Sequence, residues 1–176
     1  MRVFNTASLS TGGIRVEGTQ NFIDTQGNNL SIGVGVANPI ELASGGSLEI
    51  SVGPILFSGA ITGGGSFSHN NASTVTLSGV NSYSGGTTVK AGVLTVSGSG
   101  TFGASTGNLT ASGGTLDLAG NSFSAGTVTI SGGIIENGTL TGTSYVATSG
   151  YVSANLAGAG TLTMNSGSNQ IGRAHV

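Results

Sequence analysis

The chain has 176 residues, including 34 Gly, 2 Pro and no Cys; only 6% of its residues are charged, and its net charge is −2. Four Lys and Arg are too few to neutralise a row of phosphates, which excludes a nucleic-acid-binding surface. The absence of Cys excludes disulfides and thiolate-bound metals. A mean hydropathy of +0.26 is unlike that of a disordered chain and is typical of short strands joined by tight turns.

The N-terminal segment MRVFNTASLS lacks the apolar core of a signal peptide. No later segment approaches the roughly 18 consecutive apolar residues of a transmembrane helix. If the protein is exported, we expect its signal to lie upstream of this sequence.

A short pattern recurs along the chain, with Gly or Ser and a small residue followed by apolar, polar and apolar residues. Its copies begin at Gly46, Ser73, Gly92, Gly114, Gly126, Gly138 (a truncated copy) and Gly160. Each copy alternates with a period of two, which is typical of a strand with one buried face. In 92–96, for example, Leu94 and Val96 are predicted to point inward and Thr95 outward. No segment has the helical period of about 3.6 with capping residues, so we expect essentially no helix.

The spacing of these copies predicts the architecture. From Ser73 onward we interpret their starting positions as a loose period of roughly 22, with one period split in half at Gly126. A unit of this length cannot bury its apolar face alone, so the units must stack. The chain is therefore predicted to be an all-β, single-stranded parallel β-helix, or solenoid, of about eight coils. An antiparallel sandwich or barrel is the alternative, because the half-period spacing also suits hairpins.

One longer motif resembles a known family. The segment 75–98, VTLSGVNSYSGGTTVKAGVLTVSG, resembles the passenger-associated transport repeat of bacterial autotransporters, in which a strand ending in LSG is followed by Asn, an aromatic residue, GGTT and a GxL strand. A degenerate copy begins at 121, with Ala125 in place of the first Gly of GGTT. The resemblance gives these residues structural roles and supplies no catalytic, cofactor-binding or metal-binding set. The motif residues are Leu77, Ser78, Gly79, Asn81, Tyr83, Gly85, Gly86, Thr87, Thr88, Gly92, Leu94, Asn121 and Phe123.

The resemblance carries further expectations. Members of the family fold as right-handed parallel β-helices and cross the outer membrane with the help of a C-terminal β-barrel translocator, which we expect to lie outside this sequence. It implies a passenger fragment over 1–170, with its clearest repeat at 73–98 and degenerate repeats at 107–133 and 157–169. Its place is the cell surface or the extracellular space. The implied function is a structural stalk that supports secretion and display, and the alternative is an adhesin or self-association module that binds glycans, neighbouring cells or copies of itself.

Residues 171–176, IGRAHV, depart from the repeat. This stretch holds one of the four basic residues and one of the two His in the chain. It resembles a translated sequencing adapter, so we interpret it as an artefact that replaces the natural continuation.

Acidic residues and histidines give little sign of catalysis. The two Asp, Asp24 and Asp117, are far apart, and Glu41 and Glu49 flank a turn. Glycosidases need two carboxyl groups about 5–10 Å apart, so a polysaccharide-degrading β-helix enzyme is the weakest alternative. His69, in the polar segment FSHNNAS, is predicted to be a surface turn residue. We therefore predict a protein that is not an enzyme and has no cofactor or metal.

Two polar patterns give structural expectations. Asn81, Asn121 and Asn169 are predicted to stack at a corner as a buried amide ladder. The Thr-x-Thr pairs are interpreted as β-branched residues on outer strand faces, because Thr95 and Asp117 are expected to interrupt any continuous threonine ladder.

Overall fold

The computed structural model describes residues 13–22, 35–51, 53–158, 160–165 and 169–171. Within these residues the chain forms strands joined by turns and bends, and it contains no helix. All neighbouring strands are parallel. The fold is a parallel β-solenoid of about seven turns, a minor difference from the eight expected. The parallel pairing also rules out the antiparallel sandwich or barrel.

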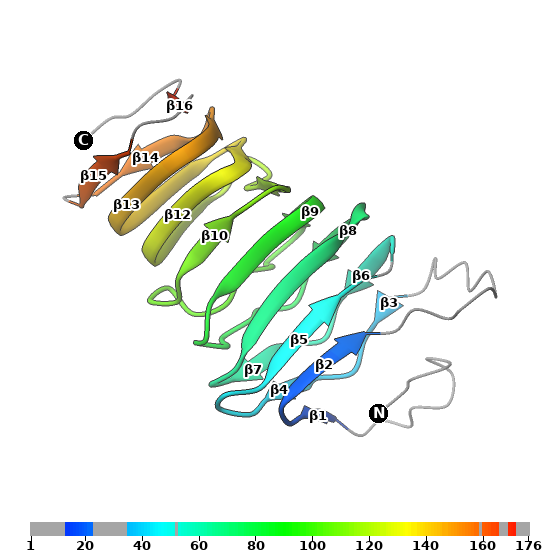
Figure 1. Ribbon diagram of the computed structural model, residues 1–176. Coiled ribbons are helices and arrows are strands. Elements are labelled where there is room, and N and C mark those ends of the chain that lie inside the picture. The colour runs from blue at the N-terminus through cyan, green and yellow to red at the C-terminus, as the bar shows by residue number, and fades with distance from the viewer. Residues whose placement is uncertain (1–12, 23–34, 52, 159, 166–168, 172–176) are drawn as a thin grey trace.

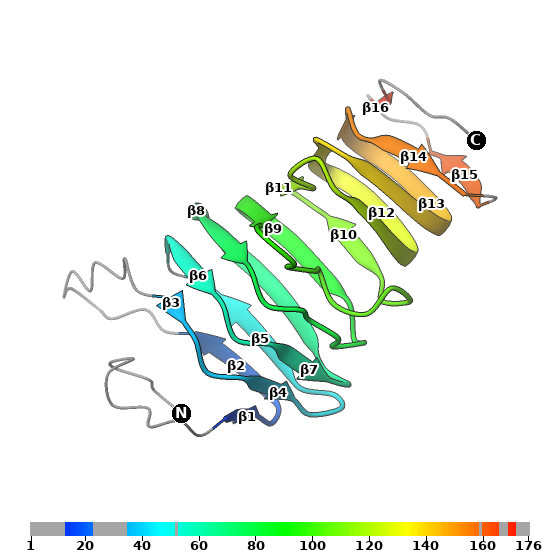
Figure 2. The same cartoon turned by 180° about the vertical axis from the view of Figure 1, so that it is seen from behind.

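The strands form three faces that run along the solenoid (Figures 1 and 2). The first face holds β1 (Ile14–Val16), β4 (Ile40–Leu42), β7 (Ile61–Gly63), the starts of β12 (Ser122–Glu136) and β13 (Thr139–Val152), and β14 (Asn155–Ala157). The second holds β2 (Thr19–Phe22), β5 (Ser47–Ile50), the starts of β8 (Ser66–Leu77) and β9 (Thr87–Val96), β10 (Leu109–Ala111), the middles of β12 and β13, and β15 (Thr161–Met164). The third holds β3 (Gly35–Val36), β6 (Ile55–Phe57), the ends of β8 and β9, β11 (Thr115–Asp117), the ends of β12 and β13, and β16 (Asn169–Ile171).

Apolar side chains form continuous columns inside the solenoid, as the alternating pattern predicted. One column on the third face has side chains at most 1% exposed. Each fully buried aliphatic side chain contributes about 1.5–3 kcal/mol relative to an exposed one, so the columns supply much of the stabilising energy. The residues of this column are Val75, Leu94, Leu116, Ile135 and Val152.

The first face is interrupted in the middle of the solenoid. Strands β1, β4 and β7 form a sheet of their own, and the face becomes regular again only at β12. Between them lie the segments 81–84 and 101–104, which do not form strands. They still follow the coil, because Ser82 N–H donates to Ile61 and Ala104 N–H donates to Tyr83 at 2.8 and 2.9 Å. We refer to 61–77, 81–96, 101–117, 122–136 and 139–152 as the third to seventh coils.

The length of the coils varies along the chain. Leu109 pairs with Thr87 of the preceding coil, and Tyr145 pairs with Val128, so the step from 87 to 109 is longer than the step from 128 to 145. The strand copies that begin at Gly114, Gly126 and Gly138 lie on the third, second and first faces of successive coils. The short spacing between these copies is therefore not a split period, because the same strand pattern serves all three faces.

The outer side of the second face carries a column of mostly hydroxyl-bearing residues. Ser68, Thr88, Thr110 and Thr129 lie beside one another on successive coils, and Val146 and Thr163 follow. Thr95 and Asp117, expected to interrupt such a ladder, belong to the third face instead. The interpretation of these threonines as outer strand residues is correct. Neither threonine column is continuous, because Asp117 follows Thr76 and Thr95 on the third face, as expected, and Val146 follows Thr129 on the second.

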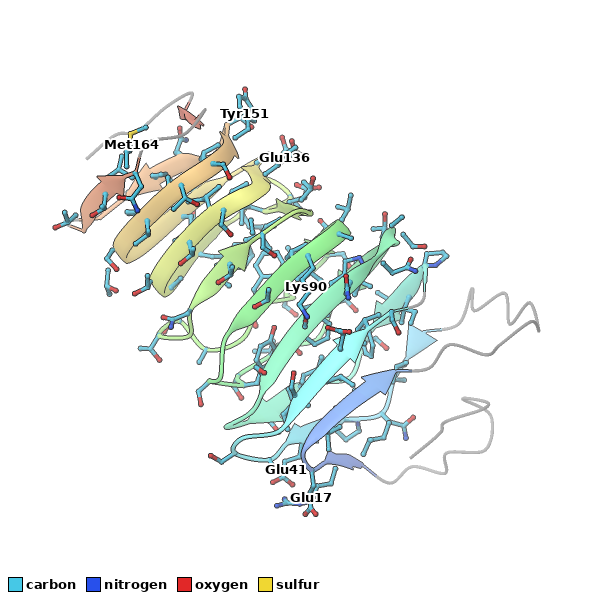
Figure 3. The ribbon with its side chains drawn as sticks, viewed as in Figure 1. Glu17, Glu41, Lys90, Glu136, Tyr151 and Met164 are labelled. Atoms are coloured by element: carbon cyan, nitrogen blue, oxygen red, sulfur yellow. The ribbon has the colours of Figure 1, made fainter. Side chains whose placement is uncertain are left out.

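Charged residues lie mainly near the N-terminal end and the middle of the solenoid. Figure 3 shows Glu17 and Glu41 together at the N-terminal end, Lys90 on the second face, and Tyr151 and Met164 toward the other end.

No helix in the described part of the chain is long and apolar enough to cross a membrane. The limits proposed for the passenger and its degenerate repeats stay predictions. Residues 172–176 of the proposed artefact, together with Asp24, lie outside the described residues.

Candidate functional site

The motif singled out in the sequence forms the fourth coil and the turn that leads into it. Gly79 lies so close to the third coil that a Cβ atom there would be 2.5 Å from the carbonyl oxygen of Gly59, and a Cβ at Gly85 would be 2.5 Å from that of Gly65. Gly92 has a φ of +63°, and a Cβ atom there would also contact the backbone of Asn71 at 2.1 Å. These glycines allow the coil to stack closely on its predecessor.

Asn81 joins three successive coils. Its Oδ1 accepts a hydrogen bond from the Ile61 N–H of the third coil at 2.8 Å. Its Nδ2 donates to the Thr101 carbonyl of the fifth coil at 2.7 Å, and its backbone N–H donates to Thr101 Oγ1 at 2.7 Å. Thr101 Oγ1 in turn donates to the Asn81 carbonyl. Because Asn81 is only 3% exposed, this arrangement pairs backbone groups that the interrupted first face would leave unpaired inside the protein.

A second chain of hydrogen bonds crosses the interior of the same coil. Thr87 Oγ1 donates to the Phe102 carbonyl at 2.8 Å, and its single hydrogen is used there. The Tyr83 hydroxyl, 2.7 Å from Thr87 Oγ1, is therefore the donor between the two hydroxyls. Burial raises the pKa of Tyr83 above its ordinary value of 10.0, so the phenol stays neutral. These hydrogen bonds thus link the fourth coil to the fifth through uncharged groups.

Aromatic rings pack beside these polar groups. Phe67 and Tyr83 have ring centroids 5.9 Å apart, and Phe57 packs edge-on against Phe67 at 6.0 Å. Further along, Phe102 and Phe123 have centroids 5.0 Å apart. All three distances lie within the range in which aromatic pairs attract beyond their buried area. The first face therefore holds together through rings and side-chain bonds where its sheet is interrupted.

The remaining motif residues have simpler environments. Leu77 and Leu94 are fully buried. Ser78 is half-buried, and its N–H donates to the Phe57 carbonyl at 2.8 Å. Gly86 has a φ of +93°, and Thr88 lies half-buried in the outer column of the second face. These positions shape and cover the coil and bring no reactive groups together.

The predicted ladder of asparagines is not present. Asn121 is exposed, and its Nδ2 donates to the Leu118 and Ala119 carbonyls of its own turn at 3.1 and 3.2 Å. Asn169 lies on the third face, in β16. The partner of Asn81 is instead Thr101, which the sequence analysis missed. The aromatic Phe102 beside it, one coil after Tyr83, is the signal that could have aligned the fifth coil with the fourth.

His69 is buried and does not lie in a surface turn, so that prediction is wrong. It lies in β8 with no exposed surface, and its Nε2 donates to the Ser73 carbonyl at 2.9 Å. Burial lowers the pKa of His69 below its ordinary value of 6.5. Strand alternation explains the placement, because Phe67 and His69 are next-but-one neighbours on the strand and point to the same side.

The acidic groups form ion pairs and turn contacts. Glu41 pairs with Arg15, and Glu49 pairs with Lys90. Asp117 Oδ1 accepts from the Ala119 N–H at 2.9 Å and from Asn137 Nδ2 at 3.1 Å. No group of three or more His, Cys, Asp or Glu side chains gathers in the described part of the chain. The arrangement that stands out is therefore the polar interior of the fourth coil, which connects coils.

Comparison with known protein families identifies this coil. Residues 70–96 match the family model of the passenger-associated transport repeat, in agreement with the resemblance at 75–98. The match covers most of β8, the segment that contains Asn81 and Tyr83, and all of β9. No curated protein and no solved structure matches the chain. The repeat family and the β-solenoid fold together fit an autotransporter passenger domain.

Proposed function

We propose that this chain is part of the structural stalk of an autotransporter passenger, and that it supports secretion and surface display of that passenger. The observation that carries the proposal is the position of the transport repeat. The matched residues form a coil in the middle of a parallel solenoid, with Asn81 bonded to the coil before it and to the coil after it.

The stacking of coils gives the stalk a role in export. Each coil buries its apolar residues only when a neighbouring coil covers them, so folding proceeds by adding coils to those already formed. The side chains of Asn81 and Thr87 make this dependence specific, because their hydrogen bonds need the fifth coil in place. A chain that emerges from the outer membrane would therefore gain stability coil by coil on the outside, which opposes its return.

The partner of such a stalk is an outer-membrane translocator, and its location is the cell surface or the extracellular space. The role requires no catalysis, cofactor or metal. It requires a rigid rod, and the parallel ladders and internal columns supply one.

Surface display tests the stalk role. We expect the chain, fused between a signal peptide and the translocator of an autotransporter, to become accessible to external protease. The variant Asn81→Leu should reduce the accessible fraction, whereas Asn121→Ala, at an exposed turn, should not. Retention of the unaltered fusion in the periplasm, or equal display of both variants, would count against the proposal.

Adhesion through self-association is a second candidate, favoured by the outer column of the second face. From Thr88 to Thr163 this column contains no charged residue. Two copies could face each other there through hydroxyl groups without charge repulsion. We expect the purified protein to dimerise and the double variant Thr110→Lys/Thr129→Lys to be monomeric in analytical ultracentrifugation. A protein that stays monomeric at high concentration, and does not aggregate cells, would rule this candidate out.

A further inference from the structure

The interruption of the first face leaves a groove of about 430 Å³ between the fifth and sixth coils. This volume is within the roughly 300–1,000 Å³ range of small-molecule sites. The groove is lined by the non-strand segment 101–105, by the start of β12 at 122–124, and by Asn81, Ser82 and Leu109. None of its lining residues is charged.

The lining combines hydroxyl groups with an aromatic surface. Ser82, Ser105, Ser122 and Ser124 all line the groove and are exposed. Phe123 also lines it and is only partly buried, whereas the neighbouring Phe102 is buried, with 5% of its surface exposed. A serine hydroxyl offers one donor and two acceptor positions, and the face of an aromatic ring attracts C–H groups.

The start of β12 adds backbone groups to this lining. Within the described strands, the middle of β12 pairs with β10 on one side and β13 on the other, whereas residues 122–125 pair with β13 alone. The edge of 122–125 that faces the groove therefore presents N–H and C=O groups that form no ladder hydrogen bonds with a neighbouring strand. Such groups favour a partner with hydroxyl donors and acceptors.

We propose that this groove binds a short segment of a neutral glycan. A sugar ring presents hydroxyl groups around its rim and C–H groups on its face, which match the serines, the free edge of 122–125 and the ring of Phe123. The inference rests on the adhesin role, the second candidate function, and gives it a site apart from the threonine column. An extended peptide, which could pair with the same edge, is the competing occupant.

The test is an NMR titration of the 15N-labelled chain with four neutral trisaccharides: maltotriose, cellotriose, mannotriose and xylotriose. We expect at least one to shift the amide signals of 101–105 and 122–125. The variant Ser124→Arg fills the groove from an exposed position and should weaken that binding at least tenfold. Phe123→Leu, which keeps apolar volume and removes the ring, should also weaken it. The control Ser131→Arg, exposed in the second half of β12 and outside the groove lining, should leave it unchanged.

Three results would overturn the proposal. They are the absence of shifts in 101–105 and 122–125 with all four sugars, equal binding by Ser124→Arg, and stronger binding of tri-galacturonic acid or of an extended Gly-Ser peptide. Sedimentation of the same variants distinguishes failure of the groove proposal from failure of the adhesin role. If self-association persists in a protein that binds no sugar, the groove proposal fails alone.

Discussion

The fourth and fifth coils and the sixth and seventh coils hold their first faces together in different ways. In the sixth and seventh, β12 and β13 run side by side from their first residues to near their ends, and backbone hydrogen bonds join them on all three faces. In the fourth and fifth, the segments 81–84 and 101–104 do not form strands, and side chains supply the missing bonds. Both pairs of coils bury the same third-face aliphatic column.

The difference shows what a recognisable repeat encodes. A backbone ladder accepts any residue that fits the inward and outward alternation, because its donors and acceptors belong to the main chain. A side-chain network needs particular residues at particular positions. This explains why the family pattern is found at 70–96, and why the longer strands of the sixth and seventh coils have regular structure without an equally specific sequence.

Removing the Asn81 amide should give the largest effect. In Asn81→Leu, the Ile61 N–H and the Thr101 carbonyl lose their side-chain partner, the first at a buried place and the second at a part-buried one. Each buried group left unpaired costs about 1–3 kcal/mol. We therefore expect the free energy of unfolding, measured by urea denaturation, to fall by about 2–5 kcal/mol.

Asn121 provides the matched control, since it occupies the corresponding position in the second copy of the motif. Its amide bonds to carbonyls of an exposed turn, and water can replace it there. Asn121→Ala should therefore cost only about 0.5–1 kcal/mol. Equal losses in the two variants would show that the two corners are held in the same way and would end the distinction between these regions.

The Thr87 hydroxyl should show the next largest effect. Thr87→Val keeps the shape of the side chain and leaves the Phe102 carbonyl and the Tyr83 hydroxyl without their partner, so we expect a loss of about 1–3 kcal/mol. A double-mutant cycle with Tyr83→Phe should give a coupling energy of at least about 0.5 kcal/mol. Thr127→Val is the control in the sixth coil. Its hydroxyl bonds to Ser144 on the outer surface, and its loss should change stability by less than about 0.5 kcal/mol.

Much of the fold could be predicted from local sequence. Alternation correctly placed Leu94 and Val96 inside and Thr95 outside, and the need to stack units predicted the parallel solenoid. Alternation also predicts a buried His69, because it lies on the same side of β8 as Phe67. The prediction of a surface turn was wrong because it relied on the polar composition of the segment FSHNNAS and not on its alternation.

Contacts between coils could not be predicted in the same way. Pairing Asn81 with Thr101 requires the length of the intervening coil, and coil length changes along the described pairings of the second face from β9 to β15. The same variation hid the threonine column, because Thr88 and Thr110 are 22 residues apart whereas Thr110 and Thr129 are 19 residues apart. The groove arises from an interruption of the sheet, and no local pattern marks it.

Acid should loosen the third and fourth coils before the sixth and seventh. The pKa of His69 is lowered in the folded protein, so the unfolded chain binds a proton first as pH falls below 6.5, and stability is lost from there toward the folded pKa. Its Nδ1, which would take that proton, is buried without a hydrogen-bond partner among the described residues. We expect the urea midpoint to fall between pH 7 and pH 5.

Two charged groups on the strands beside His69 must be separated from this effect. They are Glu49 on β5 and Lys90 on β9. The hydrogen bond from Lys90 holds the pKa of Glu49 below its ordinary value of 4.5, so Glu49 titrates in a lower pH window. His69→Gln should therefore abolish the change between pH 7 and pH 5. Between pH 7 and pH 5, hydrogen-exchange protection factors, which correct for the intrinsic effect of pH, should fall in β5, β8 and β9 and stay constant in β12 and β13. A uniform change in protection along the chain would contradict this.

The ion pair between Lys90 of the fourth coil and Glu49 should give the smallest effect. It joins β9 to β5 on the outer side of the solenoid, and the Lys90 side chain is 44% exposed. Exposed pairs contribute about 0.2–1 kcal/mol, so Lys90→Met should lower the free energy of unfolding by about 0.5 kcal/mol at low salt. In 1 M NaCl, where the screening length is about 3 Å, the difference should disappear. A loss that persists in 1 M NaCl would contradict the interpretation of this contact as an exposed ion pair that salt screens. A loss that disappears would show that side chains connect the fourth coil to its neighbours outside the solenoid as well as inside, and that water and salt weaken only the outer contact.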